Sequence, residues 1–203
     1  MARQRGYDLD GALDQMVEVF WRKGYAATTI NDLETATNLN RTSLYAALGG
    51  KEAIFLQVLK RYAVKYNDQL MRALRDNRSA KAALTDYFDR QVDQIVDRHL
   101  PGGCLLANSV VECRQSHHAF EDHISTEFHR IEAVFLDTVR RGQESGEIDE
   151  RIDAQRVARL LTATAEGMTL LARSKYPKSA LRDVAAGVLA TLGIVYAVDP
   201  VET

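Results

Sequence analysis

The chain has 203 residues, of which 46% are hydrophobic, with a formal net charge of -2 and two cysteines. This length can bury a sizeable core, either as one domain or as a small module joined to a larger one. The cysteines are too few for a disulfide framework, and no apolar run approaches the roughly 18 residues that a membrane-spanning helix needs. The first thirty residues lack the apolar block of a signal peptide, so we expect a cytoplasmic protein with reduced thiols and no membrane partner.

Charge does not decide whether the chain binds nucleic acid. Residues 1–60 carry seven Lys and Arg against seven Asp and Glu. A polyanion bound by this part of the chain would therefore need locally clustered groups, because the field of the whole segment is weak.

Hydrophobic residues recur at helical spacing along nearly the whole chain, which predicts an all-α fold. The first helix ends near Gly24, where a left-handed residue is expected. Thr29 is placed to cap a second, short helix, with Asp32 three positions further on as a short form of the capping box. The apolar face of the first helix is formed by Leu9, Ala12, Leu13, Met16, Val17 and Phe20.

A tight turn and a third short helix follow. Asn38 stands where the turn needs positive φ, and Asn40 is placed to cap a helix over 41–48. Two short helices joined by a turn of about four residues are typical of a helix-turn-helix. We therefore predict an N-terminal three-helix DNA-binding domain over residues 1–50.

The rest of the chain, residues 51–203, is predicted to be a larger helical bundle. A connecting helix over 51–75 leads into it. The last helix follows Pro177, and its apolar stripe, with small residues alongside, is expected to extend to Val195. The other helices are predicted at about 80–99, 104–114, 117–145 and 154–174.

Candidate DNA-binding residues gather around the third helix. Arg41, Thr42 and Ser43 lie on its first turn, where side chains of these types reach base edges or phosphates. Tyr45 lies one turn further along. Lys51 begins the next helix, where its charge and free backbone N–H groups would together attract a phosphate. The spacing alone also allows Tyr45 to pack on the first helix and Lys51 to be merely solvated.

The stretch "FWRKGYAATTINDLETATNLNRTSLYAALGGKEAIF" resembles the DNA-binding domain of the TetR/AcrR family of bacterial transcriptional regulators. The matching features are an aromatic residue and Gly-Tyr at the end of the first helix, and Thr-Thr-Ile at the start of the second. The third helix contains Leu-Tyr, and Lys-Glu follows it. The chain departs from the family pattern at Asn38, Asn40 and the pair Ala47-Leu48. The resemblance implies phosphate contacts from Thr29, Tyr45 and Lys51, and base or backbone contacts from Arg41, Thr42 and Ser43. The arm containing Arg3 and Arg5 would either add contacts or remain a solvated tail.

The later segment "GQESGEIDERIDAQRVARLLTATAEGM" resembles the family more loosely. This resemblance implies that residues 51–203 form a ligand-binding and dimerisation domain, and that the protein is a homodimer whose last two helices pair across a two-fold axis. It also implies a palindromic double-stranded DNA operator and release by a small-molecule effector, which together describe a repressor. The broad stripe of the last helix agrees with pairing, although an internal core helix would show the same pattern.

Two residues draw attention as possible ligand contacts. Cys104 follows a glycine turn at the N-terminus of a predicted helix, where the helix dipole lowers the pKa of a thiol. The segment "PGGCLLANSVVEC" also resembles a segment of family members that sense electrophiles or oxidants through a cysteine. An inert core cysteine is the alternative for Cys104, and still more so for Cys113. Glu166 is the only charged residue between 160 and 172. It would need a partner if buried, or else lies partly exposed. The candidate pocket comprises Phe88, Cys104, Asn108, Phe128 and Glu166.

A metal site is not predicted, although histidines cluster near Glu112 and Cys113. His123 and His129 are six residues apart, or about 240° around a helix, and no ligand pair has the usual spacing. No cofactor is expected. A helical-bundle enzyme using Glu166, Cys104 and a histidine is a remote alternative, because no nucleophile-base pair or phosphate loop is recognisable. The other two histidines of the cluster near Glu112 and Cys113 are His117 and His118.

Overall fold

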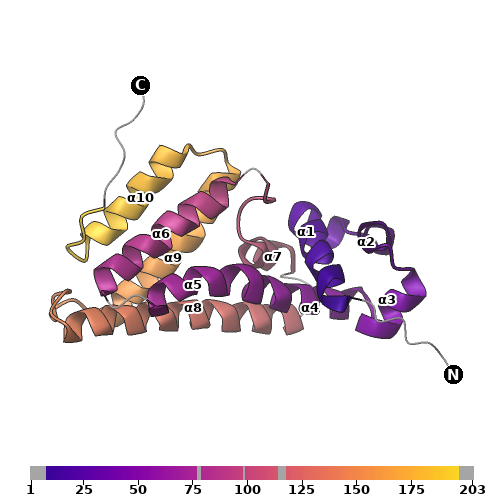
Figure 1. Cartoon of the computed structure of the whole chain (residues 1–203), viewed down its shortest axis with the longest axis horizontal. Coiled ribbons are helices and arrows are strands. Elements are labelled where there is room, and N and C mark those ends of the chain that lie inside the picture. The colour runs from indigo at the N-terminus through magenta and orange to yellow at the C-terminus, as the bar shows by residue number, and fades with distance from the viewer. Residues whose placement is uncertain (1–7, 77–78, 98, 114–117, 197–203) are drawn as a thin grey trace.

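The computed structural model describes residues 8–76, 79–97, 99–113 and 118–196. Within these ranges the ordered elements are helices, and none is a strand, which confirms the predicted all-α fold. No helix in the described part is long and apolar enough to cross a membrane. Figure 1 shows α1 to α3 gathered at one end of the molecule, with α8 running along one side and α6, α9 and α10 lying together at the other end.

The N-terminal end comprises α1 (Leu9–Ala27), α2 (Ile30–Thr37) and α3 (Arg41–Leu48). Each begins at a side-chain cap, from Asp8, Thr29 and Asn40 respectively. Thr29 and Asp32 form the expected capping box. Gly24 has φ 78°, so regular helical geometry stops there although the hydrogen-bonded element continues to Ala27. These local signals fix the lengths of the helices as predicted.

The connecting segment consists of α4 (Lys51–Tyr62), a π-helical turn at Ala63–Asn67 and α5 (Asp68–Asp76). The single helix predicted over 51–75 is therefore present but contains a π turn. A π turn accommodates one extra residue in a helix and is frequent at functional sites. Asn67 is the last residue of this turn, and only 7% of it is exposed.

The C-terminal part comprises α6 (Ala80–Val96), α7 (Leu105–Cys113), α8 (His118–Glu144), α9 (Ala154–Arg173) and α10 (Lys178–Ala190). The predicted extension of the last helical stripe to Val195 is wrong. The helix ends at Ala190, the chain turns at Gly193 with φ 66°, and Val195 is 96% exposed. Leu192 and Ile194 are still buried, so the end of the chain packs without being helical.

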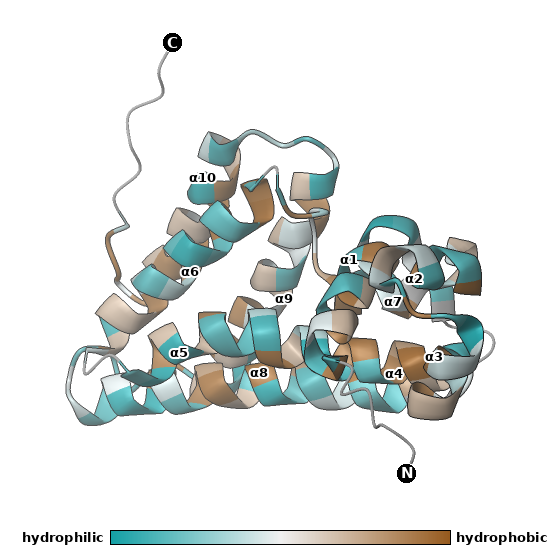
Figure 2. Ribbon diagram, turned by 45° about the vertical axis from the view of Figure 1, so that its right-hand side comes forward, coloured by the Kyte–Doolittle hydropathy of each residue, from teal (hydrophilic) through white to brown (hydrophobic). Residues whose placement is uncertain are grey.

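Two hydrophobic cores hold the helices together. One joins α5, α6, α8, α9 and α10. The other joins α1 to α4 with Cys104, Leu105 and Leu106 at the start of α7, and with Phe120 and Ile124 of α8. Hydrophobic residues accordingly line the inner faces of the helices in Figure 2. The N-terminal helices therefore share a core with α7 and α8, which follow much later in the sequence.

Candidate DNA-binding surface and ligand cavity

The third helix is held by its caps and by one buried anchor. Asn38 adopts φ 54° and makes the tight turn, and the Asn40 side chain accepts a hydrogen bond of 2.8 Å from the Ser43 backbone N–H. Leu44 is fully buried in the N-terminal core. The Glu34 carboxylate also accepts a 2.6 Å hydrogen bond from the Arg41 backbone N–H. These contacts fix the position of α3 while leaving its outer side chains free to bind.

The exposed side of α3 presents an arginine over a tyrosine. Arg41 and Thr42 are exposed, and Tyr45 is half-buried one turn along. The Arg41 guanidinium lies 5.2 Å from the centroid of the Tyr45 ring and donates to its hydroxyl at 3.3 Å. Ser43 is half-buried. The structure thus brings Arg41, Thr42 and Tyr45 together on one outward face.

Lys51 lies at the N-terminus of α4, close to the turn between α1 and α2. Its Nζ is 4.5 Å from the centroid of the Tyr25 ring and 3.5 Å from the Ala26 carbonyl oxygen. Burial lowers the pKa of Lys51, while the charges of Asp32 and Glu112 act in the opposite direction. Thr29 is exposed and hydrogen-bonded to the same Asp32 carboxylate. Thr29 and Lys51 therefore share one neighbourhood, in which a phosphate would supply a partner for the Lys51 ammonium.

Glu112 of α7 reaches this turn from the C-terminal part of the chain. Its carboxylate accepts hydrogen bonds from the backbone N–H groups of Tyr25, at 2.7 Å, and Ala26, at 3.3 Å. A Cβ atom on Gly24 would lie only 2.2 Å from the carboxylate, so glycine permits both the positive φ and the close approach. Sequence reasoning missed this role, because nothing near Glu112 in the sequence indicates a partner 86 or 87 residues away.

A small cavity lies between the π turn, α5, α6, α8, α9 and the start of α7. Its space for water centres is about 20 Å³, enough for about one water molecule. Hydrophobic and aromatic side chains form much of the wall, together with a few polar groups. The lining residues are Tyr62, Asn67, Leu70, Met71, Tyr87, Gln91, Gln94, Ile95, Gly103, Cys104, Ile131, Glu166 and Thr169.

Three polar atoms of the lining have no hydrogen-bond partner within the described part of the chain. They are Asn67 Nδ2, Gln91 Oε1 and Glu166 Oε2. Gln91 is oriented by its other end, because its Nε2 donates to the Ala165 carbonyl oxygen at 3.0 Å. Gln91 could have been noticed from the sequence, because it is a polar residue among the apolar positions of the helix predicted at 80–99. The position of Asn67 depends on the π turn, which the sequence pattern did not indicate.

The electrostatics of the cavity are set mainly by burial. Burial raises the pKa of Glu166 to about 7, and a hydrogen bond from the Cys104 thiol partly opposes this shift. Burial, and next the Glu166 charge, raise the pKa of Cys104 well above its usual value. The predicted lowering of this thiol pKa by a helix N-terminus is therefore wrong. Hydrogen bonds from the backbone of α7 do act in that direction, but Cys104 is only 5% exposed and desolvation outweighs them.

The candidate pocket residues fall into different places. Cys104 and Glu166 line the cavity. Phe88 is fully buried in the C-terminal core and stacks with Phe135. Asn108 is half-buried on α7 and is outside the lining. Phe128 lines a separate outer groove of about 420 Å³ between α7 and α8.

Some predictions fall on parts of the chain for which no structure is described. Arg3, Arg5 and His117 lie outside the described residues, and the side chains of Cys113 and His118 are outside the description as well. Among the residues that are described, no group of three or more potential ligands is placed to hold a metal ion.

Comparisons with known proteins extend over both parts of the chain. Residues 12–58 match "Bacterial regulatory proteins, tetR family", and residues 80–188 match "Tetracyclin repressor-like, C-terminal domain". The chain is 29% identical to the HTH-type transcriptional repressor ComR of Escherichia coli, over 92% of this chain and 90% of ComR. It is 27% identical to the uncharacterized HTH-type transcriptional regulator YezE of Bacillus subtilis, over 90% of this chain and 95% of YezE.

Solved structures give the same result. A cysteine mutant of the TetR-family regulator CifR, complexed with 26 bp double-strand operator DNA, superposes with a TM-score of 0.86 at 26% identity, covering 93% of this chain and 98% of that one. A TetR-family regulator from Cytophaga hutchinsonii shares the fold, with a TM-score of 0.82 at 21% identity over 92% and 93% of the two chains. The chain therefore belongs to the TetR family and is a helix-turn-helix DNA-binding transcriptional regulator.

Proposed function

We propose that the protein is a homodimeric repressor that binds a palindromic operator through α3 and leaves it when a small molecule occupies the cavity. The observation that carries this proposal is the continuity of the N-terminal core. The α1–α4 helices pack directly on Cys104, Leu105 and Leu106, and Cys104 also lines the cavity. A change in the cavity is thus transmitted to the helices that bind DNA. Similar proteins support repression and operator binding, since ComR is a transcriptional repressor and a CifR cysteine mutant was solved in complex with operator DNA.

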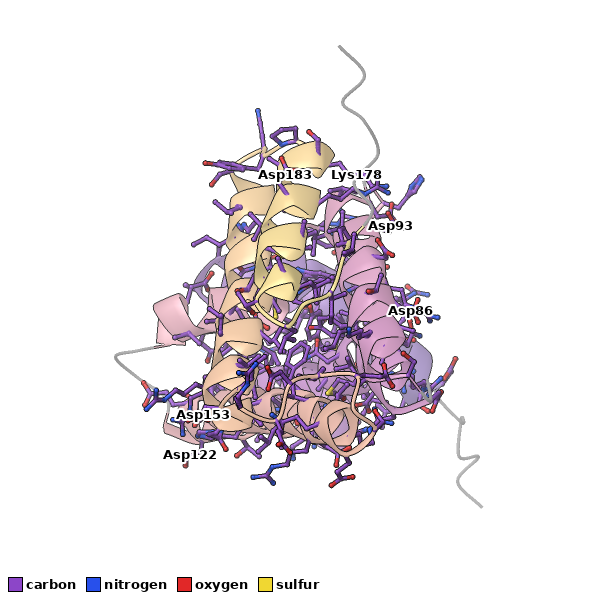
Figure 3. All side chains as sticks on the ribbon, turned by 90° about the vertical axis from the view of Figure 1, so that its left-hand side faces the viewer. Asp86, Asp93, Asp122, Asp153, Lys178 and Asp183 are labelled. Atoms are coloured by element: carbon purple, nitrogen blue, oxygen red, sulfur yellow. The ribbon has the colours of Figure 1, made fainter. Side chains whose placement is uncertain are left out.

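The dimer is supported by an exposed face on the last two helices. Leu160 and Leu170 of α9 are 45% and 65% exposed, and Ala163 lies exposed between them. On α10, Gly187 and Ala190 are exposed too. Figure 3 shows α9 and α10 side by side at the end of the molecule facing the viewer. Small and apolar residues at helical spacing allow two such faces to pack closely.

The proposed roles at the DNA differ between residues. Arg41 and Thr42 would read base edges or contact the backbone, with Ser43 adding a backbone contact, while Thr29, Tyr45 and Lys51 would bind phosphates. We favour reversible ligand binding over thiol chemistry at Cys104, because burial keeps this residue in the thiol form. We also propose no enzymatic activity, since a histidine is absent from the described lining around Cys104 and Glu166.

A fluorescence titration with operator fragments from the protein's own promoter region, at several salt concentrations, tests the proposal. Affinity should fall steeply with salt, as expected when phosphates are neutralised by lysine and arginine. Lys51→Ala should weaken binding to all operator variants about equally. Arg41→Ala should also reduce discrimination at one base pair, by about 1–3 kcal/mol.

Lys60→Ala is the matched control, because Lys60 is an exposed lysine on the same helix α4. It should bind operator as the unaltered protein does. Failure of the unaltered protein to bind any promoter fragment would overturn the proposed function, and uniform losses with Arg41→Ala would remove its base-reading role.

A further inference from the structure

The unpaired polar atoms of the cavity indicate what kind of molecule would fill it, an inference that rests on the proposed effector site. Asn67 and Gln91 are only 7% and 3% exposed. Asn67 Nδ2, Gln91 Oε1 and Glu166 Oε2 nevertheless have no protein partner in the described chain. They come from three separate segments, namely the π turn, α6 and α9. Buried polar groups are normally hydrogen-bonded, so an arrangement of this kind fits a ligand that supplies the missing partners.

The charges of the lining favour a cation. Glu166 is the one ionisable carboxyl in the described lining, which contains no lysine, arginine or histidine to balance it. An anionic ligand would meet a carboxylate without any compensating charge. Two of the three unpaired atoms, Gln91 Oε1 and Glu166 Oε2, accept hydrogen bonds and lack donors. The Gln91 amide is held against the backbone of Ala165, directly before Glu166.

The existing hydrogen bonds leave one carboxylate oxygen free for a ligand. The Tyr62 hydroxyl is hydrogen-bonded to the Cys104 thiol, and the thiol is hydrogen-bonded to the Glu166 carboxyl. Glu166 Oε2 has no part in these contacts. A group with several N–H donors could therefore bind Glu166 Oε2 and Gln91 Oε1 together. The aromatic residues Tyr62 and Tyr87 also line the cavity, and aromatic rings attract cations.

The remaining wall defines the body of the ligand. Leu70, Met71, Ile95 and Ile131 are apolar and would contact a hydrocarbon or aromatic body. Asn67 Nδ2 is a donor and would bind an oxygen acceptor. The space now open holds about one water, so the walls must move apart, which the flexible Met71 side chain next to the π turn facilitates.

We propose that the effector is a small organic amine, bound as an ammonium ion between Glu166 Oε2 and Gln91 Oε1, with an apolar body and one oxygen acceptor directed to Asn67. The ammonium pairs with the Glu166 carboxylate, and the apolar body, which is larger than the present cavity, separates its walls and shifts α4 and α7. Carboxylates and phosphates are excluded by the charge of Glu166.

Head-group exchange on constant bodies tests this proposal. The aryl set is tyramine, tyrosol and para-hydroxyphenylacetate, and the alkyl ether set is methoxypropylamine, methoxypropanol and methoxypropionate. Binding to the full-length protein is followed by the fluorescence of Trp21, the single tryptophan, whose Nε1 donates to the Gly102 carbonyl at 3.1 Å and whose ring contacts Tyr62. Release from operator is measured in parallel. In at least one set the amine should bind about tenfold more tightly than the alcohol, and the carboxylate should not bind.

Glu166→Gln keeps the shape of the side chain and removes its charge, so it should abolish the preference for the amine. Glu150→Gln removes an exposed carboxylate far from the lining and should retain the preference. Binding of the amine to the unaltered protein should also tighten from about pH 5 to about pH 8 as Glu166 ionises. The other titratable groups lining the cavity, Tyr62, Tyr87 and Cys104, have raised pKa values and stay neutral over this range.

Three results would overturn the assignment: equal binding of alcohol and amine, no binding by either amine, or an unchanged amine preference in Glu166→Gln. A protein that binds operator and releases it with a cell extract, but ignores both amines, would contradict the ligand class alone. A protein that binds no operator would contradict the proposed function itself.

Discussion

At the scale of single residues, Gly24 and Glu166 are each in an energetically unfavourable state, one through its backbone conformation and the other through the burial of its carboxyl. Gly24 holds a backbone conformation with φ 78° and ψ 171°, which is essentially restricted to glycine. Glu166 is half-buried, but its Oε2 atom is shielded from solvent, and burial of the carboxyl raises the free-energy cost of its ionisation. Neither residue improves the packing of the fold. Gly24 lies against the Glu112 carboxylate, and Glu166 lines the cavity between α5, α6, α8 and α9.

Gly24→Ala should lower the free energy of unfolding by about 1–3 kcal/mol, because a side chain there is strained and meets Glu112. Urea unfolding measures the change. Gly167→Ala is the control, since Gly167 lies inside the regular helix α9 with open space around its missing Cβ. Similar losses in both variants would show that the conformation of Gly24 is not the cause.

Glu166→Gln should stabilise the protein at high pH. The pKa of Glu166 is raised from 4.5 to about 7 in the folded state, so its unfavourable contribution is absent below about pH 4.5 and grows as pH rises to about 7. Above that, the shift corresponds to at most about 3 kcal/mol. Urea unfolding at about pH 8 should therefore favour the variant, while the two proteins should differ little near pH 4. A variant that is less stable than the unaltered protein at pH 8 would contradict the burial effect.

At the scale of elements, α7 joins the cavity to the turn between α1 and α2. It begins beside Cys104, which lines the cavity, and its Glu112 accepts hydrogen bonds from Tyr25 and Ala26. A displacement of α7 therefore acts on the turn that precedes Thr29 and lies against Lys51. This contact complements the connection through α4, which shares the core of α1 and carries Lys51 at its start.

Glu112→Ala should expose the backbone N–H groups of Tyr25 and Ala26 to faster hydrogen exchange. Two hydrogen bonds to a charged acceptor are lost, which we expect to cost about 1 kcal/mol because the site is exposed. Amide exchange followed by nuclear magnetic resonance measures the effect. Asp122→Ala, an exposed acid on α8, should leave both amides protected. Unchanged protection in Glu112→Ala would show that α7 does not hold the turn.

The elements also show what could and could not be predicted from the sequence. The helix-turn-helix was predictable because its determinants are local: Thr29, Asn38 and Asn40 act within three residues of themselves. The cavity was not, because Gln91 finds its partner, the Ala165 carbonyl oxygen, 74 residues away along the chain. The contact of Glu112 with the turn after α1 was unpredictable for the same reason. The helix-terminus argument for Cys104 considered only its own helix, whereas burial among other elements sets its pKa. The last helix was predicted to be too long because its apolar pattern continues past its end. Leu192 and Ile194 are buried, although α10 ends at Ala190.

At the scale of the whole molecule, the two cores do not follow the order of the chain. The first residues of α7 and part of α8 belong to the core of the N-terminal helices. The domain boundary at residue 50 stays a prediction. Ile54, Phe55 and Val58 of α4 follow that boundary and are buried in the same core as α1–α3. We expect α1–α4 and α7 to move together relative to α6, α9 and α10.

Leu170→Arg should convert the proposed dimer to a monomer, because it places a charge in the apolar face of α9. Analytical ultracentrifugation measures the change, and operator affinity should fall with it, since both half-sites can no longer be bound together. Val64→Arg is the control, because Val64 is 59% exposed but lies on the π turn. An unaltered protein that sediments as a monomer would contradict the dimer.

The π turn at Ala63–Asn67 sets the rotation of α4 relative to α5 about their common axis. Each residue of a helix turns the chain by about 100°, so the one extra residue accommodated by the π turn sets the angle between everything before it and everything after it. Loss of a single codon there, at the exposed Val64 for example, would leave the composition almost unchanged and still permit a continuous helix. It would nevertheless rotate α1–α4 relative to the helices that follow, and in the proposed dimer it would misalign the two copies of α3. Single-residue insertions and deletions in this segment are therefore expected to be far less tolerated than substitutions on its exposed side.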